Sequence, residues 1–131
     1  MKKKALLDSY ALLCYLKKEN NWKAVKAALS SGEISCFLNE LNAGEVYYIL
    51  ARNRGAAQAD YFLDVILPSL PLKIISNNFD LIIKASRLKA KHPISYMDCF
   101  AAATAAQEKA VLLTGDPEFK KVENLIEIEW L

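Results

Sequence analysis

Four acidic residues are the side chains of this sequence best suited to chemistry: Asp8, Glu45, Asp98 and Asp116. Asp8 and Asp116 each stand just after the apolar run of an expected strand. Ligands of parallel α/β sheets bind at the carboxyl ends of strands, so this shared position indicates a site. A ligand set made only of carboxylates suits hard cations such as Mg²⁺ or Mn²⁺ better than zinc.

Three of these acids also have a purely structural explanation. Asp8 precedes an expected helix and is a good N-cap residue. Asp116 is followed by Pro117, a common way to begin a helix. Asp98 completes a capping-box pattern with Ser95, in which the acid serves the first helical turn. Taken singly, none of these three requires a catalytic role.

Glu45 is harder to explain by helix capping. At helical spacing it shares a largely apolar face with Leu41, Asn42, Tyr48 and Ile49. A carboxylate on such a face is costly to bury unless a positive charge compensates it. An arginine could do so, but we favour a metal ion shared with the other acids.

Other chemistries find little support in the sequence. It has no GxGxxG, Walker or GxSxG motif, and its only histidine, His92, precedes a proline. Cys14, Cys36 and Cys99 are far apart and lie in apolar segments, so we expect small buried residues and no disulfide framework or zinc site.

The elements that would position the acids alternate between strands and helices. We expect strands at residues 4–8, 33–38, 72–75, 111–114 and 126–130. We expect helices at residues 9–19, 22–29, 40–54, 56–67 and 95–109, and between Asn78 and His92. Gly55 should end one helix and Pro68 another. This alternation predicts an α/β fold with a mostly parallel sheet covered by helices on both faces.

Length and composition indicate one soluble globular domain spanning residues 1–131, since 53% of the residues are hydrophobic and 24% charged. The net charge of +2 neither favours nor excludes a nucleic-acid partner. The N-terminal lysines and apolar run imitate a secretory signal, but Asp8 interrupts the run and no cleavage site follows. No stretch reaches the roughly 20 apolar residues that cross a bilayer, so we expect a cytoplasmic protein.

Four segments in this order, LLDSYALLCYL, NELNAGEVYYILARNRG, ISYMDCFAAATA and VLLTGDPEF, resemble the PIN-domain ribonucleases. They are most similar to the VapC-type toxins of prokaryotic toxin–antitoxin pairs. The resemblance covers essentially the whole chain, including the closing IEIEW segment. It implies an α/β/α sandwich in which Asp8, Glu45, Asp98 and Asp116 bind one or two Mg²⁺ or Mn²⁺ ions and cleave RNA.

The same resemblance assigns supporting roles. Ser9, Asn42 and Thr114 match polar positions of the family that would orient the carboxylates by hydrogen bonds. The metal would lower the pKa of a bound water for in-line attack on the phosphodiester, leaving a 5′-phosphate. Asp98 or Asp116 would take the proton of that water.

Several side chains could meet RNA, or could simply be a solvated surface or part of the core. The basic candidates are Arg52, Arg54, Lys84, Arg87, Lys89 and Lys91. Tyr10 and Tyr96 each lie two residues from an acid, where they could stack on a base or pack in the core.

The segment 40–67 holds more large apolar residues than a small domain can bury: Tyr47, Tyr48, Ile49, Tyr61, Phe62, Val65 and Ile66. We expect an exposed patch there, which marks a protein interface. By the resemblance, that surface would serve a homodimer and a VapB-type antitoxin. The alternatives are an RNA-processing PIN nuclease without an antitoxin, and a nonenzymatic binding module whose acids only cap helices.

Overall fold

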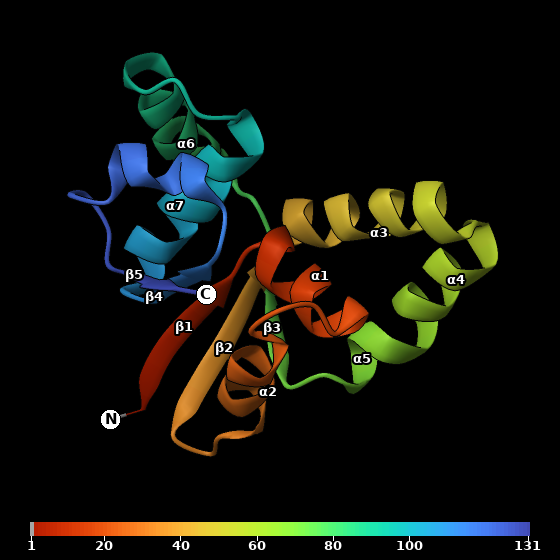
Figure 1. The fold of residues 1–131 in the computed structure, drawn as a ribbon. Coiled ribbons are helices and arrows are strands. Elements are labelled where there is room, and N and C mark those ends of the chain that lie inside the picture. The colour runs from red at the N-terminus through yellow and green to blue at the C-terminus, as the bar shows by residue number, and fades with distance from the viewer. Residues whose placement is uncertain (1) are drawn as a thin grey trace.

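A fully parallel sheet forms the centre of the computed structural model, which describes residues 2–131. Within these residues the strands are β1 (Lys3–Leu7), β2 (Ile34–Asn39), β3 (Leu72–Ile75), β4 (Val111–Thr114) and β5 (Ile128–Trp130). The α-helices are α1 (Ser9–Lys17), α2 (Trp22–Ser30), α3 (Glu40–Arg54), α4 (Ala56–Tyr61), α5 (Leu67–Ser69), α6 (Phe79–Lys91) and α7 (Tyr96–Glu108). A π-helical segment η1 (Phe62–Ile66) and a 3₁₀ helix η2 (Pro117–Val122) complete the chain (Figure 1).

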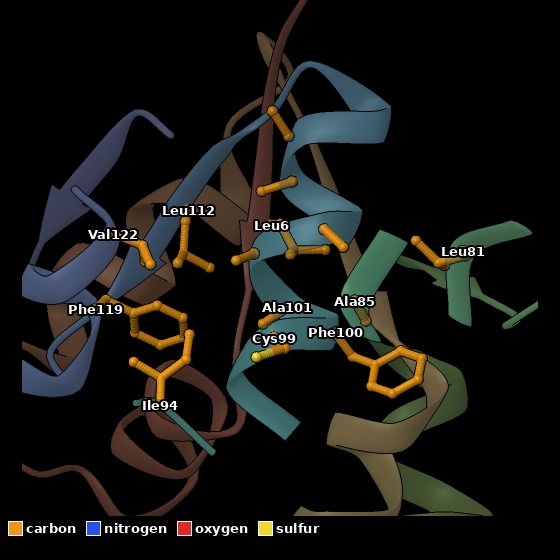
Figure 2. Packing of buried hydrophobic residues seen from close by; sticks show 14 of the residues in the cluster. Leu6, Leu81, Ala85, Ile94, Cys99, Phe100, Ala101, Leu112, Phe119 and Val122 are labelled. Carbon is orange, nitrogen blue, oxygen red and sulfur yellow. The ribbon is translucent and has the colours of Figure 1, made fainter. Parts of the chain in front are cut away.

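Successive strand residues point to opposite faces of the sheet, and each face buries its own core. Leu6 and Leu112 belong to the cluster that packs against α6 and α7 (Figure 2). Leu7 and Leu38 belong to the other cluster, with residues of α1, α2 and α3. The predicted α/β fold with helices on both faces is therefore confirmed.

The strand order β3-β2-β1-β4-β5 places a change of direction beside β1. The chain first builds outward from β1 through β2 to β3. It then crosses back over one face through α6 and α7 and adds β4 on the other side of β1. Leu7 is paired with Leu113, so the carboxyl ends of β1 and β4 lie side by side. This is the crevice in which doubly wound sheets bind ligands.

Two helix ends differ from the prediction. The first helix stops at Lys17 because Lys18 adopts a left-handed conformation, with φ of 53°. Pro68 does not stop the helical segment that begins at Ala56, which continues to Ser69. The wide turn of η1 explains this, since the Leu67 N–H bonds to the Phe62 carbonyl. Pro68 then starts a new turn, where its missing N–H costs no hydrogen bond.

The α3–α4–η1 segment projects from the side of the sheet (Figure 1). As predicted, it carries exposed apolar side chains, since Tyr48, Tyr61 and Val65 are 41–53% exposed. Leu63 is exposed as well, whereas Phe62 is buried in the core. All three cysteines are buried and unpaired. No helix within residues 2–131 is both long enough and apolar enough to cross a membrane.

Candidate functional site

Asp8 is the most buried of the four acids, with 2% of its surface exposed. It caps α1, since its Oδ1 accepts from the backbone N–H of Ala11 at 2.9 Å. Its Oδ2 accepts from the hydroxyl of Thr114, the last residue of the neighbouring strand. Burial raises the pKa of Asp8 to about 7, against the lowering effect of these two bonds. The charges of Asp98 and Asp116 raise it further.

Thr114 ties the two strand ends together. Its buried hydroxyl donates to Asp8 and accepts from the backbone N–H of Asp116 at 3.0 Å. Asp116 in turn caps η2 by accepting from the N–H of Glu118 at 3.0 Å. Asp8 and Asp116 therefore do act as caps, as their structural explanation predicts, while their charges also lie close together.

Asp98 lies in the first turn of α7 and faces the other acids. Its backbone N–H donates to the Ser95 hydroxyl at 3.1 Å, the first half of the predicted capping box. Burial raises the pKa of this half-buried carboxyl to about 6, and the charge of Asp116 adds to the rise. The Ser95 hydroxyl lowers it, and the charges of Glu45 and Glu118 raise it. Asp98 is thus the acid in electrostatic contact with all the others.

The expected environment of Glu45 needs correction. The residue is half-buried, and Tyr48 on the same face is exposed because the outer part of α3 projects from the sheet. The side-chain amide of Asn42 donates to Glu45 at 3.4 Å. The carboxylate that the fold truly buries is Asp8, so the burial argument made for Glu45 applies to Asp8 instead.

A polar network that sequence reasoning missed holds the start of α3 against α7 and the loop after β3. The buried Asn39 caps α3 through the N–H of Leu41 at 2.8 Å. Its amide also donates to Thr104 at 2.9 Å and to Asn77 at 2.7 Å. Only the cap could be read from the sequence, since Thr104 is 65 positions away. Through this network the fold sets the position of Glu45 relative to Asp98.

Two further side chains stand at the site. Glu118 follows Asp116 by two residues in the segment GDPE, and its charge raises the pKa of Asp98. It is therefore a fifth acid of the site. The Tyr10 ring lies directly over Gly115, because a Cβ added there would be 2.4 Å from a ring carbon. Tyr10 is 46% exposed, so the core-packing alternative does not describe it.

The polar residues expected to support the acids differ in what they contact. Thr114 bonds to Asp8 and Asn42 bonds to Glu45, whereas Ser9 makes no side-chain hydrogen bond with any described residue. The Oδ1 atom of Asn42 is buried without a partner among residues 2–131. Such an orphan acceptor on the residue that bonds to Glu45 fits a cation or an ordered water.

The geometry bears on how a metal could be held. Over residues 2–131, no group of three or more His, Cys, Asp and Glu side chains is close enough to hold a metal ion alone. Mg²⁺ commonly binds through one or two carboxylates and keeps several waters. The donor set therefore fits a largely hydrated Mg²⁺ or Mn²⁺ better than an ion enclosed by protein ligands.

None of the six basic residues expected to meet RNA is among the charges that shift the pKa of Asp8 or Asp98, whereas Lys121 lies 3.1 Å from Glu118. Arg54 is about 14 Å along the α3 axis from Glu45. Lys89 donates to the Ile94 carbonyl at 2.7 Å and so holds the turn before α7. The other three basic residues of α6 (Lys84, Arg87 and Lys91) line a groove of about 500 Å³ along α7.

Comparison with known proteins gives a family assignment. The family model of the PIN domain matches residues 5–125. No curated protein sequence matches the chain. A chain in the structure of VapBC2 from Rickettsia felis, bound to a DNA fragment from the promoter, is similar with a TM-score of 0.77 and 19% identity over 98% of both chains.

Two other solved structures are similar. VapC20 of Mycobacterium tuberculosis, described as a sarcin–ricin loop cleaving toxin, has a TM-score of 0.73 and 15% identity over 90% of this chain and 94% of its own. A chain of FitAcB from Neisseria gonorrhoeae has a TM-score of 0.72 and 20% identity over 95% of both chains. At these identities the likeness establishes the fold.

Proposed function

The chain belongs to the PIN-domain family, and from that premise we propose that it is an Mg²⁺- or Mn²⁺-dependent endoribonuclease. We further propose that it acts in the cytoplasm as the toxin of a toxin–antitoxin pair. The acids Asp8, Glu45, Asp98 and Asp116 are its proposed catalytic and metal-binding residues. Ser9, Asn42 and Thr114 are proposed to support them.

One observation carries the nuclease proposal: the fold buries a carboxylate whose pKa is also raised by the charges of two other acids. Asp8 is 2% exposed, and its pKa is raised to about 7 by burial and by the charges of Asp98 and Asp116. A protein that needed only helix caps would gain nothing from placing carboxylates where they raise one another's pKa. Their mutual repulsion is relieved when a divalent cation binds.

Each of the site residues has a proposed role in holding the metal or in orienting its ligands. Asp8, Asp98 and Asp116, with Glu45 from α3, would hold one or two ions together with water ligands. A bound Mg²⁺ or Mn²⁺ supplies a water of lowered pKa and neutralises charge on the phosphate. Thr114 holds the Asp8 carboxylate in one orientation through its hydroxyl.

Proton transfer is assigned to Asp98. Burial and the charge of Asp116 raise the pKa of its carboxyl, which favours the uptake of a proton there. Its oxygens would accept the proton of the attacking water. Asp116 is the alternative base, but one of its oxygens already accepts from the Glu118 N–H.

The toxin assignment is supported by the neighbours of the fold and by an exposed surface. Several similar structures are toxin–antitoxin complexes, such as those from Klebsiella pneumoniae and Salmonella typhimurium. The exposed apolar side chains of the α3–α4–η1 segment form a surface that a protein partner would cover. We propose that this surface binds a VapB-type antitoxin and contributes to a homodimer.

The nuclease proposal is tested by RNA cleavage with Mg²⁺ or Mn²⁺. Asp98→Asn should lower the rate on the order of 100-fold or more, because it removes charge where it is needed in the transition state. Asp80→Asn is the matched control, since Asp80 is exposed on α6 and, within residues 2–131, forms an ion pair with Lys84 alone. Equal cleavage by both variants and the unaltered chain would show that the acids only cap helices.

The toxin proposal is tested separately by expression in bacteria. Expression of the chain should stop growth, and co-expression of a small protein encoded beside it should restore growth. Tyr61→Glu, on the exposed apolar surface, should weaken that rescue without slowing RNA cleavage. A chain that cleaves RNA in vitro but needs no such partner would instead be an RNA-processing nuclease.

A further inference from the structure

An apolar cavity of about 510 Å³ opens between the first turn of α3 and the helices α6 and α7. Its walls are Leu41, Ile82, Tyr96, Met97 and Phe100. Met97 immediately precedes Asp98, and Leu41 lies one helical turn before Glu45 on the same face. The cavity therefore adjoins the helix side of the acidic site.

The Tyr96 ring in this cavity is exposed and yet held in place. Its hydroxyl hydrogen-bonds with the hydroxyl of Ser86 at 2.8 Å. Its ring meets that of Phe100 edge to face, with 4.9 Å between centroids. Phe100 is itself buried in the core cluster that contains Leu112 (Figure 2), so this contact fixes the exposed Tyr96 ring to the core. Because 45% of Tyr96 is exposed, a ligand ring can reach it without reordering the side chain.

The rim of the cavity carries an acceptor that is fixed in position. Glu40 accepts through Oε1 from the backbone N–H of Asn77 at 3.0 Å and from its side-chain amide at 3.4 Å. The other oxygen, Oε2, has no hydrogen-bond partner among residues 2–131. A carboxylate can only accept, so a ligand edge must offer it an N–H group.

We propose that this cavity binds one unpaired nucleobase of the RNA, stacked on Tyr96 and selected by Glu40 for an exocyclic amino group. Aromatic rings stack with any base, so Tyr96 contributes affinity. Cytosine, adenine and guanine carry amino groups that a carboxylate reads, whereas uracil carries a carbonyl in the corresponding place. The inference rests on the proposed function, because the base would belong to a nucleotide next to the cleaved phosphate.

The test measures binding of labelled six-nucleotide RNAs, oligo(C) and oligo(U), to the full chain in EDTA by fluorescence anisotropy. The unaltered chain should bind oligo(C) more tightly than oligo(U). Tyr96→Leu should weaken both by about 5- to 100-fold through lost stacking, whereas Tyr96→Phe should keep most of the affinity. Trp22→Leu, at an aromatic residue of α2, a helix that contributes no residue to the cavity, is the control and should change neither.

Glu40→Gln tests the selectivity separately. The glutamine amide can donate as well as accept, so the ratio of oligo(C) to oligo(U) affinity should fall towards one. An unchanged ratio, or a Tyr96→Leu variant that binds as the unaltered chain does, would overturn the proposal. So would light scattering showing a dimer that Tyr96→Leu separates, because a second copy would then fill the cavity.

Cleavage of the same oligonucleotides with Mn²⁺ distinguishes this inference from the proposed function. Cleavage that is indifferent to Tyr96 and Glu40 overturns the base subsite and leaves the nuclease intact. Binding that depends on Tyr96, with no cleavage of any RNA under any metal, supports the subsite and overturns the nuclease.

Discussion

The acidic site has two halves that are held in different ways. The strand-end half consists of Asp8 and Asp116, which follow β1 and β4. Their oxygens are already engaged: Asp8 accepts from Ala11 and Thr114, and Asp116 accepts from Glu118. These carboxylates are fixed by the register of the sheet and by helix capping.

The helix-borne half consists of Glu45 on α3 and Asp98 on α7. Both side chains are half-buried. Glu45 accepts one long bond of 3.4 Å from Asn42, and Asp98 has the Ser95 hydroxyl beside it. We infer that the hydrogen bonds of Asp8 and Asp116 hold the strand-end half in a fixed position. The carboxylates of Glu45 and Asp98 have more oxygens free to bind a ligand.

The largest expected effect on stability comes from neutralising the buried carboxylate of Asp8. The pKa of Asp8 is raised to about 7 from 3.8, so the folded protein binds this proton more tightly than the unfolded chain. Stability without metal should therefore rise as the pH falls from about 7 to about 4. Asp8→Asn keeps a capping oxygen and should increase the free energy of unfolding at pH 8 by as much as about 4 kcal/mol.

Urea unfolding in EDTA at pH 8 and pH 4 checks this expectation. The advantage of Asp8→Asn should disappear at pH 4, where the unaltered carboxyl is protonated in the folded state. Asp80→Asn, which removes an exposed ion pair, should change stability by less than about 1 kcal/mol at either pH. A destabilised Asp8→Asn protein at pH 8 would mean that its hydrogen bonds outweigh the cost of burial.

A second prediction separates the two halves by their response to metal. At a Mg²⁺ concentration 100-fold above its Kd, the unaltered chain should gain about 2.7 kcal/mol of stability. Asp98→Asn should lose more of this gain than Asp116→Asn, because the oxygens of Asp98 are less engaged. Thermal unfolding at pH 8 across a Mg²⁺ titration measures both. If both variants lose the same amount of Mg²⁺-dependent stability, Asp98 and Asp116 do not differ in how they bind the metal.

The third prediction concerns Thr114, which links the two strand ends. Thr114→Val removes the donor to Asp8 and the acceptor for the Asp116 N–H, and should destabilise the fold by about 1–3 kcal/mol. The loss should be larger at pH 8 than at pH 5, because the hydroxyl lowers the pKa of Asp8 by stabilising its charged form. Thr114→Ser keeps the hydroxyl and should lose less. A loss independent of pH would mean that the Thr114 hydroxyl does not stabilise the charged form of Asp8.

The strand-end half could be predicted from sequence because its geometry is local. An apolar run followed by an acid places Asp8 and Asp116 at strand ends, and the order of strands and helices brings such ends together. The Ser95 cap could be predicted for the same reason, since its hydroxyl bonds to an N–H three residues away. Asn39 and Asn78 cap the helices that follow them through equally local bonds.

The helix-borne half could not be predicted to the same depth because it depends on contacts distant in the chain. Helical spacing gave the face of Glu45 but not how far α3 projects from the sheet. The bond from Asn39 to Thr104, which sets α3 against α7, joins residues from two separate elements. The helix likewise continues past Pro68 because of the wide turn at Phe62. No local sequence pattern predicts such a turn.

The smallest expected effect concerns the Tyr10 ring, which lies over Gly115 beside Asp116. A Cβ on Gly115 would lie 2.4 Å from the Tyr10 ring, so Gly115→Ala must displace that ring. The displaced atoms are the far end of a half-exposed side chain, so the cost should stay below about 1 kcal/mol. In a Tyr10→Ala background the same substitution should cost nothing, and a double-mutant cycle of urea unfolding measures the difference. A cost that persists without Tyr10 would show that the backbone, and not the ring, requires glycine beside Asp116.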